Sequence, residues 1–303
     1  MGHDHGHATA TGRHRGRLTA VLVLTLVVMV AEVVGGLLSG SLALLADAGH
    51  MLTDASGIGL ALVASVLAAR PAGGRRSFGL ARAEVLAAAA NALLLLGVAA
   101  FVLVEGVRRL LDPRPVESGA MLVVALAGLV VNLVGLRLLH AGQGESLNVR
   151  GAYLEVLADL LGSVAVVVAA LVIALTGWLR ADALVSLGIG LLVVPRALSL
   201  LRDTLDVLLE STPRGVDLDD VRAHVLTVEG VVDVHDVHVW TLTGGLPVMS
   251  AHVVVEEDVL DRAGSGRVLD ALGGCLAEHF DVEHSTFQLE PAGHSAHEGA
   301  QHD

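Results

Sequence analysis

Two pairs of potential metal-binding side chains lie inside long apolar stretches of the chain. His50 and Asp54 are four residues apart, and so are Glu155 and Asp159. On an α-helix this spacing places each pair on one face, one turn apart. If the two helices face each other, one imidazole nitrogen and three carboxylates surround a common point. The spacing therefore predicts a cation site inside the apolar part of the chain.

The charge of this group argues for a bound cation rather than for simple structural burial. A carboxylate at the centre of a bilayer costs roughly 3 kcal/mol on insertion scales. No Arg or Lys lies near these acids on the same two stretches, so Asp54, Glu155, Asp159 and the neighbouring Asp47 are expected to need protons or a cation. Asp47 precedes His50 by three residues and is a candidate to orient its ring without binding the ion itself.

The donor types favour a divalent transition-metal ion. One nitrogen and three oxygen donors suit tetrahedral zinc. Three ionised carboxylates exceed the charge of one divalent ion, so the empty site is expected to bind protons. Metal entry would then expel protons, and returning protons would expel the metal. This competition is the minimum chemistry for exchanging metal against protons.

The composition is that of a membrane protein. Of 303 residues, 53% are hydrophobic and 17% are charged, an apolar excess typical of membrane-spanning chains. Six apolar segments are each long enough to cross a hydrocarbon layer of roughly 30 Å at the helical rise. They are predicted at residues 18–38, 42–69, 83–110, 119–140, 152–176 and 183–208.

Arginine placement predicts the orientation of the chain. Nine Arg residues precede the first segment or flank the second and fourth connections between segments, whereas four lie on the other side. Positive charge accumulates on the cytoplasmic side of a membrane. We therefore expect a multi-pass protein of the inner (plasma) membrane with both termini in the cytoplasm.

The net charge of −13 argues against a nucleic-acid partner. No phosphate-binding G-x-x-x-x-G-K-[ST] sequence occurs, and no organic cofactor is expected.

The character of the chain changes after Pro213, where apolar runs shorten and acidic residues multiply. A helix at 216–228, strands at 231–241 and 247–256, a helix at 267–280 and a strand at 285–290 predict a small α+β domain. The predicted domains are a His-rich disordered tail at 1–17, a transmembrane domain at 18–210, a soluble domain at 211–291 and a disordered tail at 292–303.

His235 and His238 are three residues apart in the first predicted strand. Strict strand alternation therefore puts their side chains on opposite faces, where they would not share a metal.

Five stretches carry a resemblance to a known family. In chain order they are SLALLADAGHMLTDAS, FGLARAEVLAAAAN, ESLNVRGAYLEVLADLLGS, LLESTP and VHDVHVWTLT. Together they resemble the motifs of the cation diffusion facilitator family, the zinc-type exporters, from Glu32 to about Glu290. The resemblance implies an α-helical membrane protein with six transmembrane helices, a cytoplasmic metallochaperone-like α+β domain, a homodimer, and proton-driven efflux of Zn²⁺ or, as alternatives, Cd²⁺, Co²⁺, Mn²⁺ or Fe²⁺.

The resemblance also implies which residues bind metal. The family's transport ligands fall on His50, Asp54, Glu155 and Asp159, and its cytoplasmic ligands fall on His235, His252 and Glu290. A set of two His and one Glu is chemically reasonable for zinc. The domain that carries it is expected to sense metal and to dimerise. His284 is a further candidate ligand there.

One ligand departs from the family pattern. Zinc-type members commonly have His at the position of Glu155, so the site shifts towards one nitrogen and three oxygens. Harder oxygen donors tolerate Mn²⁺, Fe²⁺ or Co²⁺ better, although the affinity order still favours zinc over these ions. The metal preference, the proton stoichiometry and the role of the His-rich tails therefore stay open.

Two other functions are weighed against a transporter. An intramembrane metallohydrolase would need a metal-bound water and a general base, as in H-E-x-x-H, and no such sequence occurs. A membrane-anchored metal sensor would need the membrane part only as an anchor. Six helices with a buried four-ligand site are more than an anchor requires. The sequence therefore predicts a transporter and not an enzyme.

Overall fold

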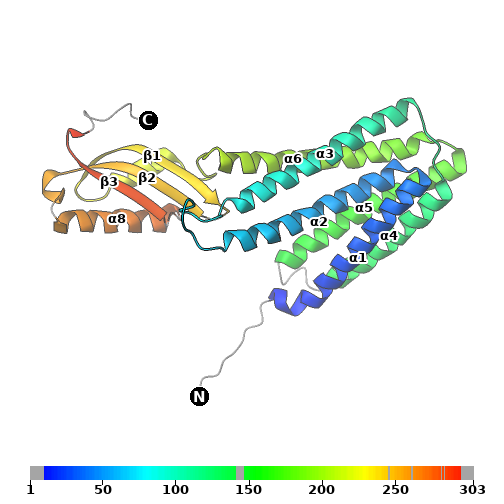
Figure 1. The fold of residues 1–303 in the computed structure, drawn as a ribbon, viewed down its shortest axis with the longest axis horizontal. Coiled ribbons are helices and arrows are strands. Elements are labelled where there is room, and N and C mark those ends of the chain that lie inside the picture. The colour runs from blue at the N-terminus through cyan, green and yellow to red at the C-terminus, as the bar shows by residue number, and fades with distance from the viewer. Residues whose placement is uncertain are drawn as a thin grey trace, which may run out of the picture. The chain divides into compact units, whose positions relative to one another are not determined.

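The computed structural model describes residues 10–140, 147–244, 246–260, 262–280, 282 and 284–294. Six long helices precede a smaller part with a β-sheet in the described chain (Figure 1). The helices are α1 (Ala10–Ser39), α2 (Leu42–Ala68), α3 (Ala83–Leu111), α4 (Ser118–His140), α5 (Leu147–Thr176) and α6 (Arg180–Leu208). Each is long and apolar enough to cross a membrane. The six transmembrane segments predicted from the sequence are thus confirmed.

Helix α1 begins earlier than the apolar pattern predicts. Residues 10–17, predicted as part of a disordered tail, form its first turns. That prediction is wrong for these residues because extending an existing helix adds a backbone hydrogen bond per residue without a new nucleation cost. Helix α5 also starts before the predicted residue 152, at Leu147. Residues 1–9 and 295–303, which hold most of the His-rich tails, lie outside the described residues.

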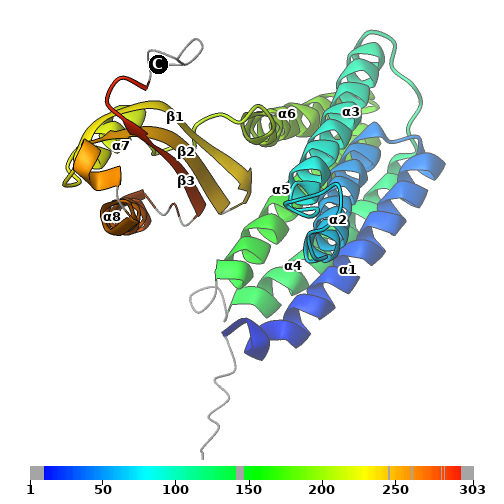
Figure 2. The ribbon, with the colours of Figure 1, turned by 60° about the vertical axis from the view of Figure 1, so that its left-hand side comes forward.

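The chain forms two compact units. The first comprises residues 1–60 and 90–199, and the second comprises residues 61–89 and 200–303. In the first unit, α4 packs along both α1 and α5 (Figure 2). A Cβ atom added at Gly135 of α4 would lie only 3.3 Å from Val156 Cγ1 of α5. Small residues thus allow these helices to approach closely, as is common between transmembrane helices.

The second unit contains a three-stranded sheet in the order β1 (Val231–Thr243), β2 (Leu246–Val255), β3 (His284–Pro291). β1 and β2 are antiparallel, whereas β2 and β3 are parallel and are joined through the short helix η1 (Glu257–Leu260) and helix α8 (Arg262–Phe280). Helices α7 (Leu218–Val225) and α8 pack on the sheet (Figure 2). Their contact is apolar and includes Val221, Leu272 and Met249, all fully buried. The predicted helix–strand–strand–helix–strand order is confirmed.

Candidate metal sites

The start of α2 is fixed by a carboxylate from α6. Gly40 has a positive φ of 71° and lets the chain turn between α1 and α2. The buried Asp182 accepts hydrogen bonds from Ser41 Oγ (2.6 Å) and from the backbone N–H groups of Leu42 (2.8 Å) and Ala43 (3.1 Å). These are donors that the first turn of a helix leaves without intrahelical partners. The cap therefore ties α6 to the N-terminus of α2, the helix that carries His50 and Asp54.

Three of the four predicted transport ligands border one cavity. Asp54 of α2 and Glu155 and Asp159 of α5 line a cavity of about 220 Å³. His50 Nε2 lies 3.5 Å from Asp54 Oδ2. Asp159 is buried, with 8% exposure, whereas the Glu155 side chain is 53% exposed. The two pairs thus lie on facing helices, and their binding of a metal stays a prediction.

His50 instead borders another cavity, of about 480 Å³, together with Asp47. Asp47 is buried against the backbone of α5, since a Cβ atom added at Gly162 would lie 2.9 Å from Asp47 Oδ1. Within the described residues, His50 Nδ1 has no hydrogen-bond partner. Asp47 therefore does not hold that nitrogen in this conformation, and its orienting role stays a prediction.

A cation does lie beside these carboxylates. Arg196 Nη1 is 3.7 Å from Asp54 Oδ2, and Arg196 Nη2 is 3.6 Å from Glu155 Oε1. The expectation that the acids have no basic neighbour was limited to their own helices, and it is wrong for the folded chain because α6 supplies one. The sequence held a usable signal, because an Arg inside an apolar segment that also contains Pro195 is itself a candidate functional residue.

The predicted cytoplasmic ligands meet on the sheet. His235 Nε2 lies 3.3 Å from Glu290 Oε2, and His252 Nδ1 lies 2.8 Å from Glu290 Oε1. Two ligands of a tetrahedral zinc ion, each bound at about 2.0–2.1 Å, lie roughly 3.3 Å apart. The spacing and the nitrogen and oxygen donors therefore fit zinc. Glu290 is almost fully buried, and Gln288 Nε2 donates to its Oε1 at 2.8 Å.

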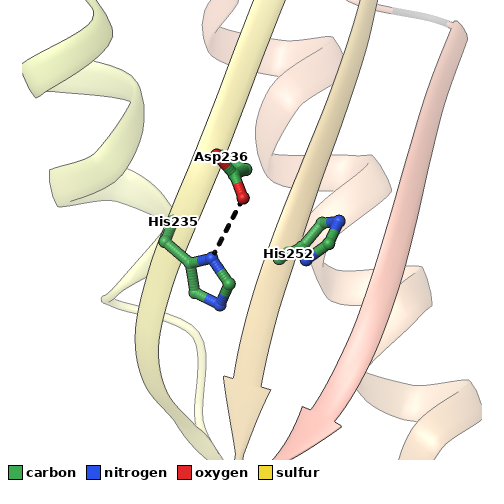
Figure 3. Close-up of side chains that lie close together, drawn as sticks. All are labelled: His235, Asp236 and His252. Atoms are coloured by element: carbon green, nitrogen blue, oxygen red, sulfur yellow. Dashed lines mark ion pairs between the residues drawn. The ribbon is translucent and has the colours of Figure 1, made fainter. Parts of the chain in front are cut away.

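Asp236 is a further candidate ligand that sequence reasoning missed. Ligand atoms of His235, Asp236 and His252 all lie within 4.8 Å of one another (Figure 3). Asp236 Oδ2 is 3.6 Å from His235 Nδ1. In a regular strand, neighbouring side chains point to opposite faces, so Asp236 would point away from His235. Its positive φ of 48° breaks that alternation.

The same irregularity corrects the prediction that His235 and His238 lie on opposite faces. His235 pairs with His252 and His238 pairs with Ser250. A step of three residues along β1 therefore matches a step of two residues along β2. This is a β-bulge, and the extra residue shifts the alternation by one position. His235 and His238 therefore lie on the same face of β1, although His238 is exposed.

His284 is not part of this group, so its candidacy as an additional ligand is wrong. It pairs with Val248 at the start of β3, whereas His252 pairs with Gln288. Four strand residues span about 13 Å, which is beyond the reach of a shared ion. The His284 ring instead packs edge-on against Phe78, with ring centroids 5.9 Å apart. Sequence order alone did not supply the strand register that separates these residues.

Two family models cover nearly all of the described structure. Residues 18–209 match the cation efflux transmembrane domain, and residues 213–292 match the cytoplasmic domain of cation efflux proteins. The chain belongs to the cation efflux family. The resemblance seen in the sequence motifs is thereby confirmed.

Relatives in the cation efflux family match over almost their whole length. The chain is 46% identical to the metal cation efflux system protein CzcD of Cupriavidus metallidurans, covering 100% of this chain and 94% of the relative. It is 42% identical to the zinc transporter ZitB of Escherichia coli, covering 96% and 93%. It is 36% identical to a cadmium, cobalt and zinc/H(+)-K(+) antiporter of Bacillus subtilis, covering 97% and 94%.

A solved structure also matches part of this cation efflux protein. It is the metal-bound C-terminal domain of the CzcD transporter from Cupriavidus metallidurans, which is 39% identical and covers 25% of this chain and 99% of the solved chain, with a TM-score of 0.22.

Proposed function

We propose that this protein exports divalent transition-metal cations, zinc first, from the cytoplasm in exchange for protons. The observation that carries the proposal is the cavity among α1, α2 and α5, which Asp54, Glu155 and Asp159 line together. His50 adds a nitrogen donor beside Asp54. Full-length relatives named as zinc and metal efflux proteins support the same function.

The chemistry of exchange follows from the donor set. Carboxylates and imidazole bind a metal only when they are deprotonated, so metal and protons compete for the same atoms. A metal arriving from one side displaces protons, and protons arriving from the other side displace the metal. The helices then have to open the cavity to one side at a time. No ATP-binding sequence is needed, because the proton gradient supplies the driving force.

The donor set also bears on the choice of metal. His50 provides a borderline nitrogen, whereas Asp54, Glu155 and Asp159 provide hard oxygens. Zinc accepts this mixture in tetrahedral sites. Cadmium and cobalt occur in the name of the Bacillus subtilis relative, and the oxygen-rich set is compatible with Co²⁺, Mn²⁺ and Fe²⁺. We place zinc first and treat the others as weaker substrates.

The cytoplasmic domain is proposed as a zinc-binding, dimerising unit. His235, His252 and Glu290 would hold the ion, with Asp236 as a fourth donor, because their ligand atoms already lie close together. A resident zinc there would act structurally or as a sensor of cytoplasmic metal. The match to the cytoplasmic domain of cation efflux proteins supports a homodimer. The Arg distribution supports cytoplasmic termini.

Two alternatives receive no such support. The named relatives are transporters, whereas a membrane-anchored sensor would not need acids lining a cavity between helices. An intramembrane hydrolase would need a general base beside a metal-bound water, and the sequence next to His50 is Met-Leu-Thr rather than a Glu-containing motif.

The proposal is tested by zinc uptake into proteoliposomes with an imposed pH gradient. Asp159→Ala removes a buried donor and is expected to abolish pH-driven uptake, while Asp112→Ala, an exposed acid after α3, keeps the wild-type rate. Uptake by the wild type should reverse in sign when the gradient is reversed. Uptake that ignores the gradient, or that survives Asp159→Ala, would contradict the proposal.

A further inference from the structure

Arg196 is the feature of the transport region that the proposed function leaves unexplained. It lies on α6, inside a helix apolar enough to cross the membrane. Its two terminal nitrogens approach two different helices, with Nη1 3.7 Å from Asp54 Oδ2 on α2 and Nη2 3.6 Å from Glu155 Oε1 on α5. The guanidinium therefore bridges two of the four proposed metal ligands.

We infer that Arg196 is a tethered counter-cation that occupies the carboxylates of the metal-free site and competes with the transported metal for them. This inference rests on the proposed function, because it assumes that Asp54 and Glu155 bind the metal. Asp54 Oδ2 faces both His50 Nε2 and Arg196 Nη1, so an ion held between His50 and Asp54 would use an oxygen that faces the guanidinium. It also repels the guanidinium, since both are cationic. Metal binding thus requires Arg196 to withdraw.

The contacts of Arg196 are loose enough for withdrawal. Both distances exceed the 2.7–3.2 Å range of N–H···O hydrogen bonds, so the pair is held by charge rather than by a locked geometry. The Arg196 side chain is 53% exposed. It borders the cavity of about 480 Å³ that also contains Asp47 and His50. That cavity gives the guanidinium room to move, and its wall offers a third carboxylate, that of Asp47.

Arginine suits this role for a chemical reason. A guanidinium stays charged at any physiological pH, so it neutralises the empty site whether or not protons are available. Three carboxylates without a counter-charge would hold a divalent ion too tightly for easy release. A competing tethered cation lowers the affinity for metal and speeds its departure. An exporter benefits from both effects, because it must empty its site in every cycle.

A purely structural role for Arg196 predicts the opposite result. If Arg196 served to hold α2, α5 and α6 together, its loss would loosen the ligand set and weaken metal binding. If it competes with the metal, its loss strengthens metal binding. The direction of the change in apparent affinity therefore distinguishes the two roles.

The test measures zinc transport by the full-length protein in proteoliposomes. Arg196→Gln is expected to lower the KM for zinc by about tenfold, roughly 1.4 kcal/mol, and to lower kcat because release becomes slower. Arg196→Lys keeps the charge and should stay near the wild type. Arg202→Gln, which changes an exposed Arg on the same helix, is the matched control and should leave both constants unchanged.

A second measurement uses the unmodified chain and does not depend on the folding of a variant. Zinc should raise the reactivity of Arg196 towards phenylglyoxal, measured by peptide mass spectrometry, because the ion displaces the guanidinium from Asp54 and Glu155. An unchanged or raised KM in a folded Arg196→Gln protein, or reduced labelling with zinc, would overturn the inference. Failure of the proposed function would show separately, as transport that survives Asp159→Ala.

Discussion

Asp182 gives the sharpest stability prediction, because one buried carboxylate joins α6 to the start of α2. We predict that Asp182→Ala strongly destabilises the first compact unit. The side chain is 1% exposed, and Arg109 Nη1 lies 3.6 Å from Asp182 Oδ2. In the variant, the N–H groups of Leu42 and Ala43 and the hydroxyl of Ser41 all lose their acceptor.

The expected cost can be worked from these contacts. Removing one partner of a buried, hydrogen-bonded charge costs about 3–5 kcal/mol, and loss of a helix N-cap costs about 1 kcal/mol within that sum. Arg109 keeps part of its environment, because its Nη1 donates to Gly40 O at 2.5 Å and its Nε donates to Glu105 Oε1 at 3.2 Å. We therefore expect about 4 kcal/mol for Asp182→Ala. Ser41→Ala removes one of these three bonds and also the bond that the Leu44 N–H donates to Ser41 Oγ at 3.2 Å, so it should cost about 2 kcal/mol.

The assay is denaturant unfolding of the purified protein in detergent micelles, followed by intrinsic fluorescence and helical circular dichroism. Asp203→Ala is the control, since Asp203 is an exposed acid on the same helix whose pair with Arg214 is worth little. The cap lies about 12 Å along α2 from His50, so the apparent zinc affinity of the folded fraction should not change. Equal unfolding midpoints for Asp182→Ala and Asp203→Ala would refute the reasoning.

Two further predictions concern the metals themselves. Glu155→His replaces a hard oxygen by a borderline nitrogen, so a panel of metals on proteoliposomes should show zinc transport favoured over Mn²⁺ more strongly than in the wild type; an unchanged panel would contradict the selectivity argument. His252→Ala should remove about one zinc ion per chain from the full-length protein in equilibrium dialysis, because two or three donors are too few for tight binding. His238→Ala, exposed on the neighbouring strand, is the control, and equal loss from both variants would count against the assigned site.

Much of the architecture could be predicted from local pattern. Continuous apolar runs gave the six membrane-spanning helices, and only their ends shifted, as at Leu147. The soluble domain followed from Val-rich strands and turn residues, and its order of elements was correct. Such features depend on neighbours within a few residues in the sequence, so they can be predicted from the sequence of one chain.

The errors at the candidate metal sites share one physical cause, which is contact between residues far apart in the chain. The side of β1 on which Asp236 lies depends on a bulge that only the pairing with β2 reveals. Likewise, His284 was a plausible ligand until the strand register placed it against Val248 rather than beside the other ligands. A strand's alternation is a local rule, and one inserted residue reverses it for everything that follows.

The sequence by itself determined which donor groups lie together on two helix faces, because the members of the pairs His50/Asp54 and Glu155/Asp159 are four residues apart. Only the tertiary structure decided what surrounds those donors. It brought Arg196 of α6 to within 4 Å of two of the acids. The reason is geometric, since helical periodicity fixes which side chains share a face, whereas packing between helices fixes which charges meet across them.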